Sequence, residues 1–137
     1  MITKKIKGDI LSSAHVHIVF ASNVEGYNDA GFAGLISSRY WPELANIGAQ
    51  PFGKVLEKSS NGKVFHALVC HSLRETGWNG AAKAIREGLD GIMVAPDEEI
   101  GVVMMGAGMI GQMQGADVAA NLKAMEESKH KIVVYSL

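Results

Sequence analysis

Apolar and polar residues change their period several times along the chain. Apolar and β-branched residues alternate or run continuously in six segments, which we expect to be strands: 2–7, 15–21, 52–58, 64–70, 100–105 and 131–137. Apolar residues recur every three or four positions in three other segments, which we expect to be helices: 30–40, 81–89 and a last one that contains 118–125. Residues 92–99 fit neither pattern.

The predicted elements follow the order β-β-α-β-β-α-β-α-β. This order predicts an α/β fold, a three-layer α/β/α sandwich around a mixed, largely parallel sheet. The pair Asn61-Gly62 is typical of a two-residue turn and predicts a hairpin between the third and fourth strands. Residues 2–7 alternate as an edge or near-edge strand does. Because the chain has 137 residues and neither repeats nor linkers, we expect a single domain over 1–137.

Charge and composition exclude several classes of partner. The 13 basic and 14 acidic residues leave a net charge of −1, which predicts no binding to DNA, RNA or an anionic membrane. The chain has no run of 18 apolar residues and no apolar N-terminal segment, so we expect neither a membrane helix nor a signal peptide. Cys70, the single cysteine, lies in an apolar run and is expected in the core. We therefore expect a cytoplasmic protein in a reducing compartment.

A glycine-rich segment between the strand 100–105 and the last helix is the most informative stretch. Gly106, Gly108 and Gly111 allow the backbone to adopt positive φ and to approach a ligand without an intervening Cβ. The helix that follows offers free N–H groups and a partial positive charge. The segment therefore suits a phosphate.

Two other interpretations of this glycine-rich segment were weighed. Residues 106–111 have the G-x-G-x-x-G spacing of a dinucleotide-binding (Rossmann) loop. That fingerprint requires an acidic residue about 20 residues further on, at the end of a second strand. Here Glu126 and Glu127 fall inside an expected helix, so we reject it. A tight strand-to-helix turn that binds nothing remains the alternative.

Glycines also lie near the start of the helix 30–40. Gly31 and Gly34 occupy its first turns, where each glycine costs about 1 kcal/mol relative to alanine, so they indicate close approach of the backbone to another group.

The histidines and methionines are assigned structural positions. We expect His66 in the core, His15, His17 and His130 at the surface, and Met104, Met105, Met109 and Met113 in packing. No spacing among the histidines predicts a metal site, and no cofactor is expected.

Several stretches, taken in order, resemble motifs of the macro domain, a fold that binds ADP-ribose and its derivatives. Lys7-Gly-Asp-Ile10 is similar to its G-D-I, and Ile18-Val-Phe-Ala-Ser-Asn23 with Gly31-Phe-Ala-Gly-Leu-Ile36 is similar to its I-V-N-A-A-N and G-V-x-G-A-I. Phe65-His-Ala-Leu-Val-Cys-His71 lies where the family has a strand reading I-H-A-V, and Met105 to Gly111 lies where it has I-S-T-G-I-F-G. The resemblance spans essentially the whole chain. It is nearest to the branch of terminal ADP-ribose glycohydrolase and ADP-ribose-1″-phosphate phosphatase.

The resemblance implies a site for a small-molecule ligand of the ADP-ribose type. Asp9 would accept a hydrogen bond from the adenine amino group and Ile10 would help to hold the base, while a turn-forming role is the alternative for Asp9. The diphosphate would lie between the two glycine-rich loops, which could bind it without lysine or arginine. The ligand-binding residues that it implies are Asp9, Ile10, Ser22, Asn23, Ala30, Gly31, Phe32, Gly106, Ala107, Gly108, Met109, Ile110 and Gly111.

The chain departs from the family at the residues that hydrolyse ADP-ribosyl bonds. The catalytic acids of two hydrolase branches fall on Ala33 and near Ile110, and the lysine of one branch falls near His71. The remaining candidates are Asn23, which could orient a water or the distal ribose, Asn28 and Asp29 in the first glycine loop, and His71. A structural hydrogen bond is the alternative for His71. Three functions stay open: a hydrolase or phosphatase acting on ADP-ribose-1″-phosphate or ADP-ribosylated targets, a non-catalytic ADP-ribose reader, and a binder of a related cyclic nucleotide.

Overall fold

The computed structural model describes residues 1–74 and 76–136. The elements are β1 (Ile2–Lys7), η1 (Ile10–Ser12), β2 (His17–Asn23), α1 (Gly31–Arg39), η2 (Pro42–Ala45), β3 (Val55–Ser60), β4 (Lys63–His71), α2 (Ala81–Gly91), β5 (Glu99–Val103), α3 (Met109–Met113), α4 (Val118–Glu126) and β6 (Lys131–Ser136). The expected order of strands and long helices is confirmed, with α3 and the two short 3₁₀ helices as additions.

The strands form one sheet in the order β1-β6-β5-β2-β4-β3. Every neighbouring pair is parallel except β3 with β4, which is antiparallel. Asn61 and Gly62 both have positive φ (53° and 76°) and connect β3 to β4, as expected of a two-residue hairpin turn. The predicted mixed, largely parallel sheet and the edge position of β1 are therefore confirmed.

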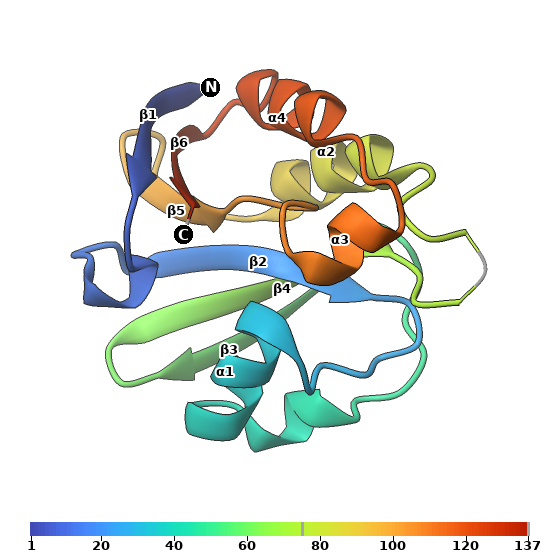
Figure 1. Ribbon diagram of the computed structural model, residues 1–137. Helices are drawn as coiled ribbons and strands as arrows, with labels where there is room; N and C mark the ends of the chain where they lie inside the picture. The colour runs from blue at the N-terminus through green and yellow to red at the C-terminus, as the bar shows by residue number, and fades with distance from the viewer. Residues whose placement is uncertain (75, 137) are drawn as a thin grey trace.

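Helices cover both faces of the sheet, with α2 and α4 on one side and α1 on the other (Figure 1). One core cluster lies under α2 and α4, where Ile85, Leu89 and Met125 pack on the sheet. The other lies under α1 and η2, where Ile36 and Trp41 pack on Phe20. Burial of apolar side chains on both faces is the main stabilising term of such a sandwich.

Several strand boundaries differ from the sequence prediction by two or three residues. β2 begins at His17 and continues to Asn23, because its last residues pair with the end of β4. β3 begins at Val55, since Gly53 has a φ of 83° and interrupts the extended backbone before it. β5 ends at Val103, two residues before the predicted end, and residues 92–98 connect α2 to it without regular structure. Leu137, the predicted end of the last strand, lies outside the described residues.

Three residues occupy environments opposite to those predicted. His130 is buried, 6% exposed, and its Nε2 lies 2.8 Å from the carbonyl oxygen of Leu89, so the surface prediction for it was wrong. Met109 and Met113 are 78% and 79% exposed, so their predicted packing role was also wrong. Both belong to α3, a single short turn that stands apart from the sheet and presents these side chains to solvent.

Candidate functional site

A cavity of about 400 Å³ lies at the carboxyl ends of β2, β4 and β5. This volume is within the range of sites for nucleotide-sized ligands, about 300–1,000 Å³. The end of a parallel sheet between such loops is the usual position of a ligand in α/β folds. Its lining residues are Phe20, Ala21, Asn23, Tyr27, Asn28, Asp29, Ala30, Gly31, Phe32, Ala33, His71, Leu73, Trp78, Val103, Met104, Gly106, Gly108, Met109, Ile110 and Gly111.

One wall of the cavity is the loop that leads into α1. Gly31 is the first helical residue, its φ is 61°, and a Cβ built on it would meet no heavy atom within 4 Å. Ala30 caps the helix without a side-chain hydrogen bond, so the first N–H groups of α1 have no side-chain partner there. Phe32 packs edge-on against Phe20 and fixes the start of the helix over the sheet. Free helical N–H groups therefore border the cavity.

The opposite wall is the glycine-rich segment 106–111. Gly106 has a φ of 92°, a conformation that favours glycine. A Cβ on Gly111 would lie 2.3 Å from the carbonyl oxygen of Gly106, so the loop closes on itself only because this position has no side chain. Gly108 differs from both, because a Cβ there would meet nothing within 4 Å. Two of these glycines shape the loop, and the third keeps its surface open to the cavity.

The polar side chains beside the first loop hold it in place. The Asn23 Oδ1 accepts hydrogen bonds from the N–H groups of Gly26 and Tyr27, and its Nδ2 donates to the Tyr27 carbonyl at 2.7 Å. The buried Ser22 hydroxyl donates to the Asn28 Oδ1 at 2.8 Å, and the Asn28 Nδ2 donates to a backbone carbonyl of η2. Asn23 and Asn28 thus line the cavity, but their amides already have hydrogen-bond partners in the protein. These hydrogen bonds fix the shape of the loop.

His71 and Trp78 form the side of the cavity at the end of β4. Their rings stack in parallel, with centroids 4.2 Å apart and an interplanar angle of 4°. His71 is 7% exposed, and burial lowers its pKa to about 4 while the Glu25 charge and the Ser72 backbone oppose the shift in part. The imidazole is therefore neutral near pH 7. The His71 Nδ1 and the Trp78 Nε1 are buried without a hydrogen-bond partner among the described residues.

Residues 72–78 connect this aromatic pair to both loops. The Glu25 carboxylate accepts hydrogen bonds from the Ser72 hydroxyl at 2.6 Å and from the Leu73 N–H at 2.8 Å. Burial alone would raise the pKa of Glu25, but these two hydrogen bonds, together with one from its own backbone and the charge of Arg74, hold the pKa below its ordinary value. On the other side, the Gln114 amide, directly after α3, donates to the carbonyls of Ser72 and Leu73. Residues 72 and 73 are therefore hydrogen-bonded to side chains from both sides of the cavity.

The charge of the cavity lining is low. Among the described residues of the lining, Asp29 is the only acidic one, and none is a lysine or an arginine. Asp29 is exposed, whereas His71 is buried and neutral, so the two differ strongly in their surroundings. An anionic ligand would have to be held by backbone N–H groups.

The structure brings together most of the predicted site residues and separates four of them from the cavity. Asp9 caps η1, and its carboxylate accepts from the Leu11 N–H at 2.9 Å and the Ser12 hydroxyl at 3.0 Å, the geometry of the turn-forming alternative. Ile10, 3% exposed, packs in the core under α1. Ser22 and Ala107 do not line the cavity either. Contact of these residues with adenine or a ligand stays a prediction.

Sequence reasoning missed several residues of the lining, above all Trp78. Tyr27, Leu73 and Trp78 belong to irregular segments, where no periodicity marks them. Trp78 follows Thr76-Gly77, and its position beside Gly106 depends on tertiary contacts rather than on the local sequence pattern. The aromatic residue in a polar turn was the one available signal.

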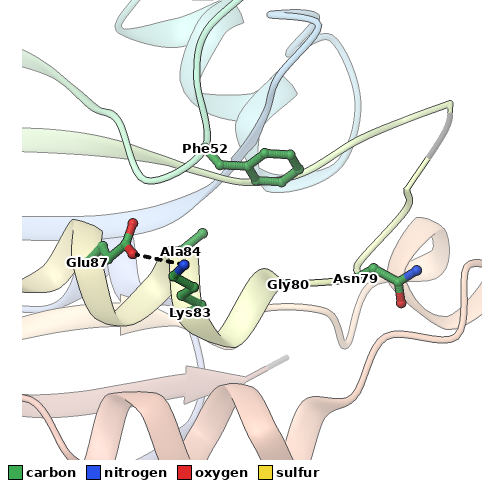
Figure 2. Close-up of a pocket in the computed structure, with 6 residues that line it drawn as sticks. All are labelled: Phe52, Asn79, Gly80, Lys83, Ala84 and Glu87. Carbon is green, nitrogen blue, oxygen red and sulfur yellow. Dashed lines mark ion pairs between the residues drawn. The ribbon is translucent and has the colours of Figure 1, made fainter.

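A second, smaller cavity of about 240 Å³ lies on the outer side of α2 (Figure 2). Phe52, 43% exposed, covers it from the loop before β3, and Lys83 pairs with Glu87 at 3.9 Å along the helix. Both charged side chains are more than half exposed, so nothing in this lining orients a ligand. It is a surface depression beside an exposed ion pair.

Among the described residues no group of three or more His, Cys, Asp or Glu side chains could hold a metal ion, and no described helix is long and apolar enough to cross a membrane.

Comparisons with known proteins agree in their fold. A scan against protein-family models found no match, and a search of curated proteins found none. A structure search matched the macrodomain of Mycobacterium tuberculosis DarG with a TM-score of 0.74 at 18% identity, over 100% of this chain and 98% of that one. It also matched an Oceanobacillus iheyensis macrodomain variant with ADPR (TM-score 0.64, 16% identity, 96% of this chain and 82% of that one). A third match is alphavirus P23pro-zbd, with a TM-score of 0.68 and 16% identity. The match extends over 98% of this chain and 21% of that one.

These matches extend over the whole sheet and its helices, although the sequences have diverged below 20% identity. The chain therefore has the macrodomain fold.

Proposed function

We propose that this protein binds ADP-ribose or a close derivative in the cavity at the carboxyl ends of β2, β4 and β5. The observation that carries the proposal is the pair of backbone walls, one at the start of α1 and the other at residues 106–111, on opposite sides of one cavity. A macrodomain with ADPR among the structural neighbours supports the identity of the ligand. The near-absence of charge in the lining supports it further, because the diphosphate would be held by N–H dipoles.

The size and chemistry of the walls suit a nucleotide diphosphate rather than a nucleoside. The open position at Gly108 and the positive φ of Gly31 leave backbone accessible on both sides. Apolar side chains such as Phe32 and Val103 line the same cavity as this backbone. Hydrogen bonds to a charged group strengthen in such a site, because the local dielectric is low.

Binding is the function that the geometry supports best, ahead of hydrolysis. The Asn23 amide is engaged within its own loop, so it has little capacity left to position a water. A His71 imidazole with a pKa of about 4 is a weak base at neutral pH. Asp29 and Tyr27 are the remaining ionisable groups among the described lining residues, and the exposure of the Asp29 carboxylate is the observation that keeps hydrolysis of an ADP-ribose derivative as the second candidate.

Calorimetric titration tests binding, and a product assay tests turnover. ADP-ribose is expected to bind more tightly than AMP, which lacks the diphosphate, and equal affinity for the two would contradict the proposal. Turnover is measured on ADP-ribose-1″-phosphate and on an ADP-ribosylated protein with the wild type and the Asp29→Ala/His71→Ala variant. We expect no release of product by either protein. A rate that falls about 10²- to 10⁴-fold in the variant would instead establish the second candidate, since that is the usual loss for a general base.

A further inference from the structure

We infer that His71 and Trp78 form a subsite for the sugar at the far end of the ligand, which accepts a free hydroxyl and discriminates against a terminal phosphate. The inference rests on the proposed function, since it assumes that a nucleotide diphosphate lies between the two backbone walls. It adds a specificity that neither the glycine loops nor the fold provides. Trp78 has no counterpart among the motifs that carry the resemblance of this chain to macro domains.

The first step of the argument is the position of the pair. His71 ends β4, which neighbours β2 on the side away from β5. The two backbone walls follow β2 and β5, so a diphosphate between them has His71 and Trp78 on its β4 side. A Cβ on Gly106 would lie 3.7 Å from Trp78 Cε3, which places the indole directly beside the glycine-rich segment. A group attached to the diphosphate on this side therefore meets the two rings.

The second step is the pair of polar atoms that have no protein partner. Trp78 Nε1 can only donate a hydrogen bond, and a neutral histidine has one donor and one acceptor nitrogen. Trp78 Nε1 and His71 Nδ1 are both buried and unpaired among the described residues, although both side chains line the cavity. Most buried polar groups in proteins are hydrogen-bonded, so two unpaired ones in the wall of a cavity require an explanation, and a bound ligand would supply the missing partners. A sugar hydroxyl both donates and accepts, so it can satisfy the two rings together.

The third step is the electrostatics of this end of the cavity. A phosphate monoester is a dianion near pH 7 and can only accept hydrogen bonds. Neutral His71 offers it at most one N–H, and a second, charged donor would require protonation of the imidazole. Burial opposes that protonation. Asp29 in the lining and Glu25 behind Leu73 would add repulsion, which Arg74 beside Glu25 offsets only in part, and no described lysine or arginine lines the cavity. A neutral hydroxyl meets none of these penalties.

The fourth step is the rigidity of the subsite. The parallel stack fixes the two rings relative to each other. Glu25 and Gln114 form hydrogen bonds with residues 72 and 73, so the backbone directly after His71 is held as well. A subsite held in this way discriminates between ligands because it cannot rearrange cheaply to accept the wrong group.

The test compares three probes by calorimetry: ADP-ribose, ADP-ribose-1″-phosphate and ADP, which keeps the diphosphate but lacks the far sugar. In the wild type, ADP-ribose is expected to bind at least about tenfold more tightly than either of the other two. Trp78→Phe keeps an aromatic ring and removes the N–H, so it should weaken ADP-ribose about 3- to 10-fold and leave ADP unchanged. Trp41→Phe is the matched control, because Trp41 is buried under α1 and away from the cavity.

The outcomes separate this inference from the proposed function. If neither ADP-ribose nor ADP binds the wild type, the proposed function fails and the subsite fails with it. If both bind and their affinities are equal, the diphosphate site stands and the subsite is refuted. Tighter binding of the 1″-phosphate refutes it too. If a folded Trp78→Phe protein loses the same affinity for ADP as for ADP-ribose, the indole serves packing alone and the subsite is refuted. His71→Phe is an independent second variant, judged by the same comparison of the two affinities.

Discussion

Gly108 is the residue at which the phosphate site can be tested with least disturbance to the fold. Its φ of −73° and ψ of 176° are extended values that any residue adopts, and a Cβ there would meet no heavy atom within 4 Å. The residue is exposed and lines the cavity. A side chain at position 108 would therefore project into the volume proposed for the diphosphate while the loop keeps its shape.

Gly108→Glu is expected to weaken ADP-ribose binding through charge. A carboxylate at about 5 Å from a phosphate charge repels it by about 0.8 kcal/mol at the dielectric constant of water and by about 3 kcal/mol at an effective value near 20. These limits correspond to roughly a 4-fold and a 300-fold loss of affinity. Because Gly108 is exposed, salt should screen the repulsion, so the loss should shrink as ionic strength rises.

The assay is calorimetric titration of ADP-ribose at low and at high salt, with thermal unfolding as the check that the variant is folded. Gly108→Gln is the matched control, since it has nearly the size of glutamate without its charge, and Gly108→Ala controls for the loss of glycine. Alanine should bind as the wild type does. Undiminished affinity in a folded Gly108→Glu protein would refute the placement of the diphosphate. An equal loss in Gly108→Gln would refute the electrostatic reasoning.

Three further predictions concern stability and the base. Gly111→Ala should destabilise the fold by about 1–3 kcal/mol in urea unfolding, because its Cβ would lie 2.3 Å from the Gly106 carbonyl oxygen; a wild-type midpoint would contradict this packing. Burial lowers the pKa of both His66 and His71 to about 4, so between pH 6.5 and pH 4 the unfolded chain binds protons that the folded one excludes. The free energy of unfolding should thus fall with decreasing pH by at most about 1.4 kcal/mol per pH unit for each histidine, and His66→Gln should reduce this slope. Asp9→Ala should cost about 0.5–2 kcal/mol of stability through loss of the cap on η1; weaker ADP-ribose binding by the same variant, measured calorimetrically, would show that Asp9 also reads the base.

The elements that could be predicted from sequence are those whose signal is local. The alternation in 2–7, the Asn61-Gly62 turn and the helical period of 81–89 each depend on neighbouring residues only, and each predicts the observed element within a few residues. The glycine-rich segment 106–111 was also found in this way, because positive φ and close approach require glycine at the position itself. Fold class followed from the order of these elements.

The elements that could not be predicted depend on tertiary contacts. The chain after Gly111 was expected to continue into one helix, but Gly115, with a φ of 68°, separates α3 from α4, whose cap is Asp117. The isolated turn α3 then leaves Met109 exposed. His130 was expected outside because histidine is polar, yet its ring finds the Leu89 carbonyl in the interior. A hydrogen bond to a residue so distant in sequence leaves no trace in the local pattern.

The same distinction applies to the site and explains why its specificity is more difficult to predict than its location. The two phosphate walls are made of backbone, so glycine alone signals them, whereas the side that faces the far sugar is made of His71 and Trp78. Residues 72 and 73, directly after His71, are held by hydrogen bonds to Glu25 from the first loop and to Gln114, which follows the second. Each loop therefore contributes a side chain that orders the specificity element as well as a backbone wall for the diphosphate. A substitution that displaces either loop should consequently alter both the affinity for the diphosphate and the discrimination at the sugar end, because each loop contacts the diphosphate and also holds residues 72 and 73 beside His71.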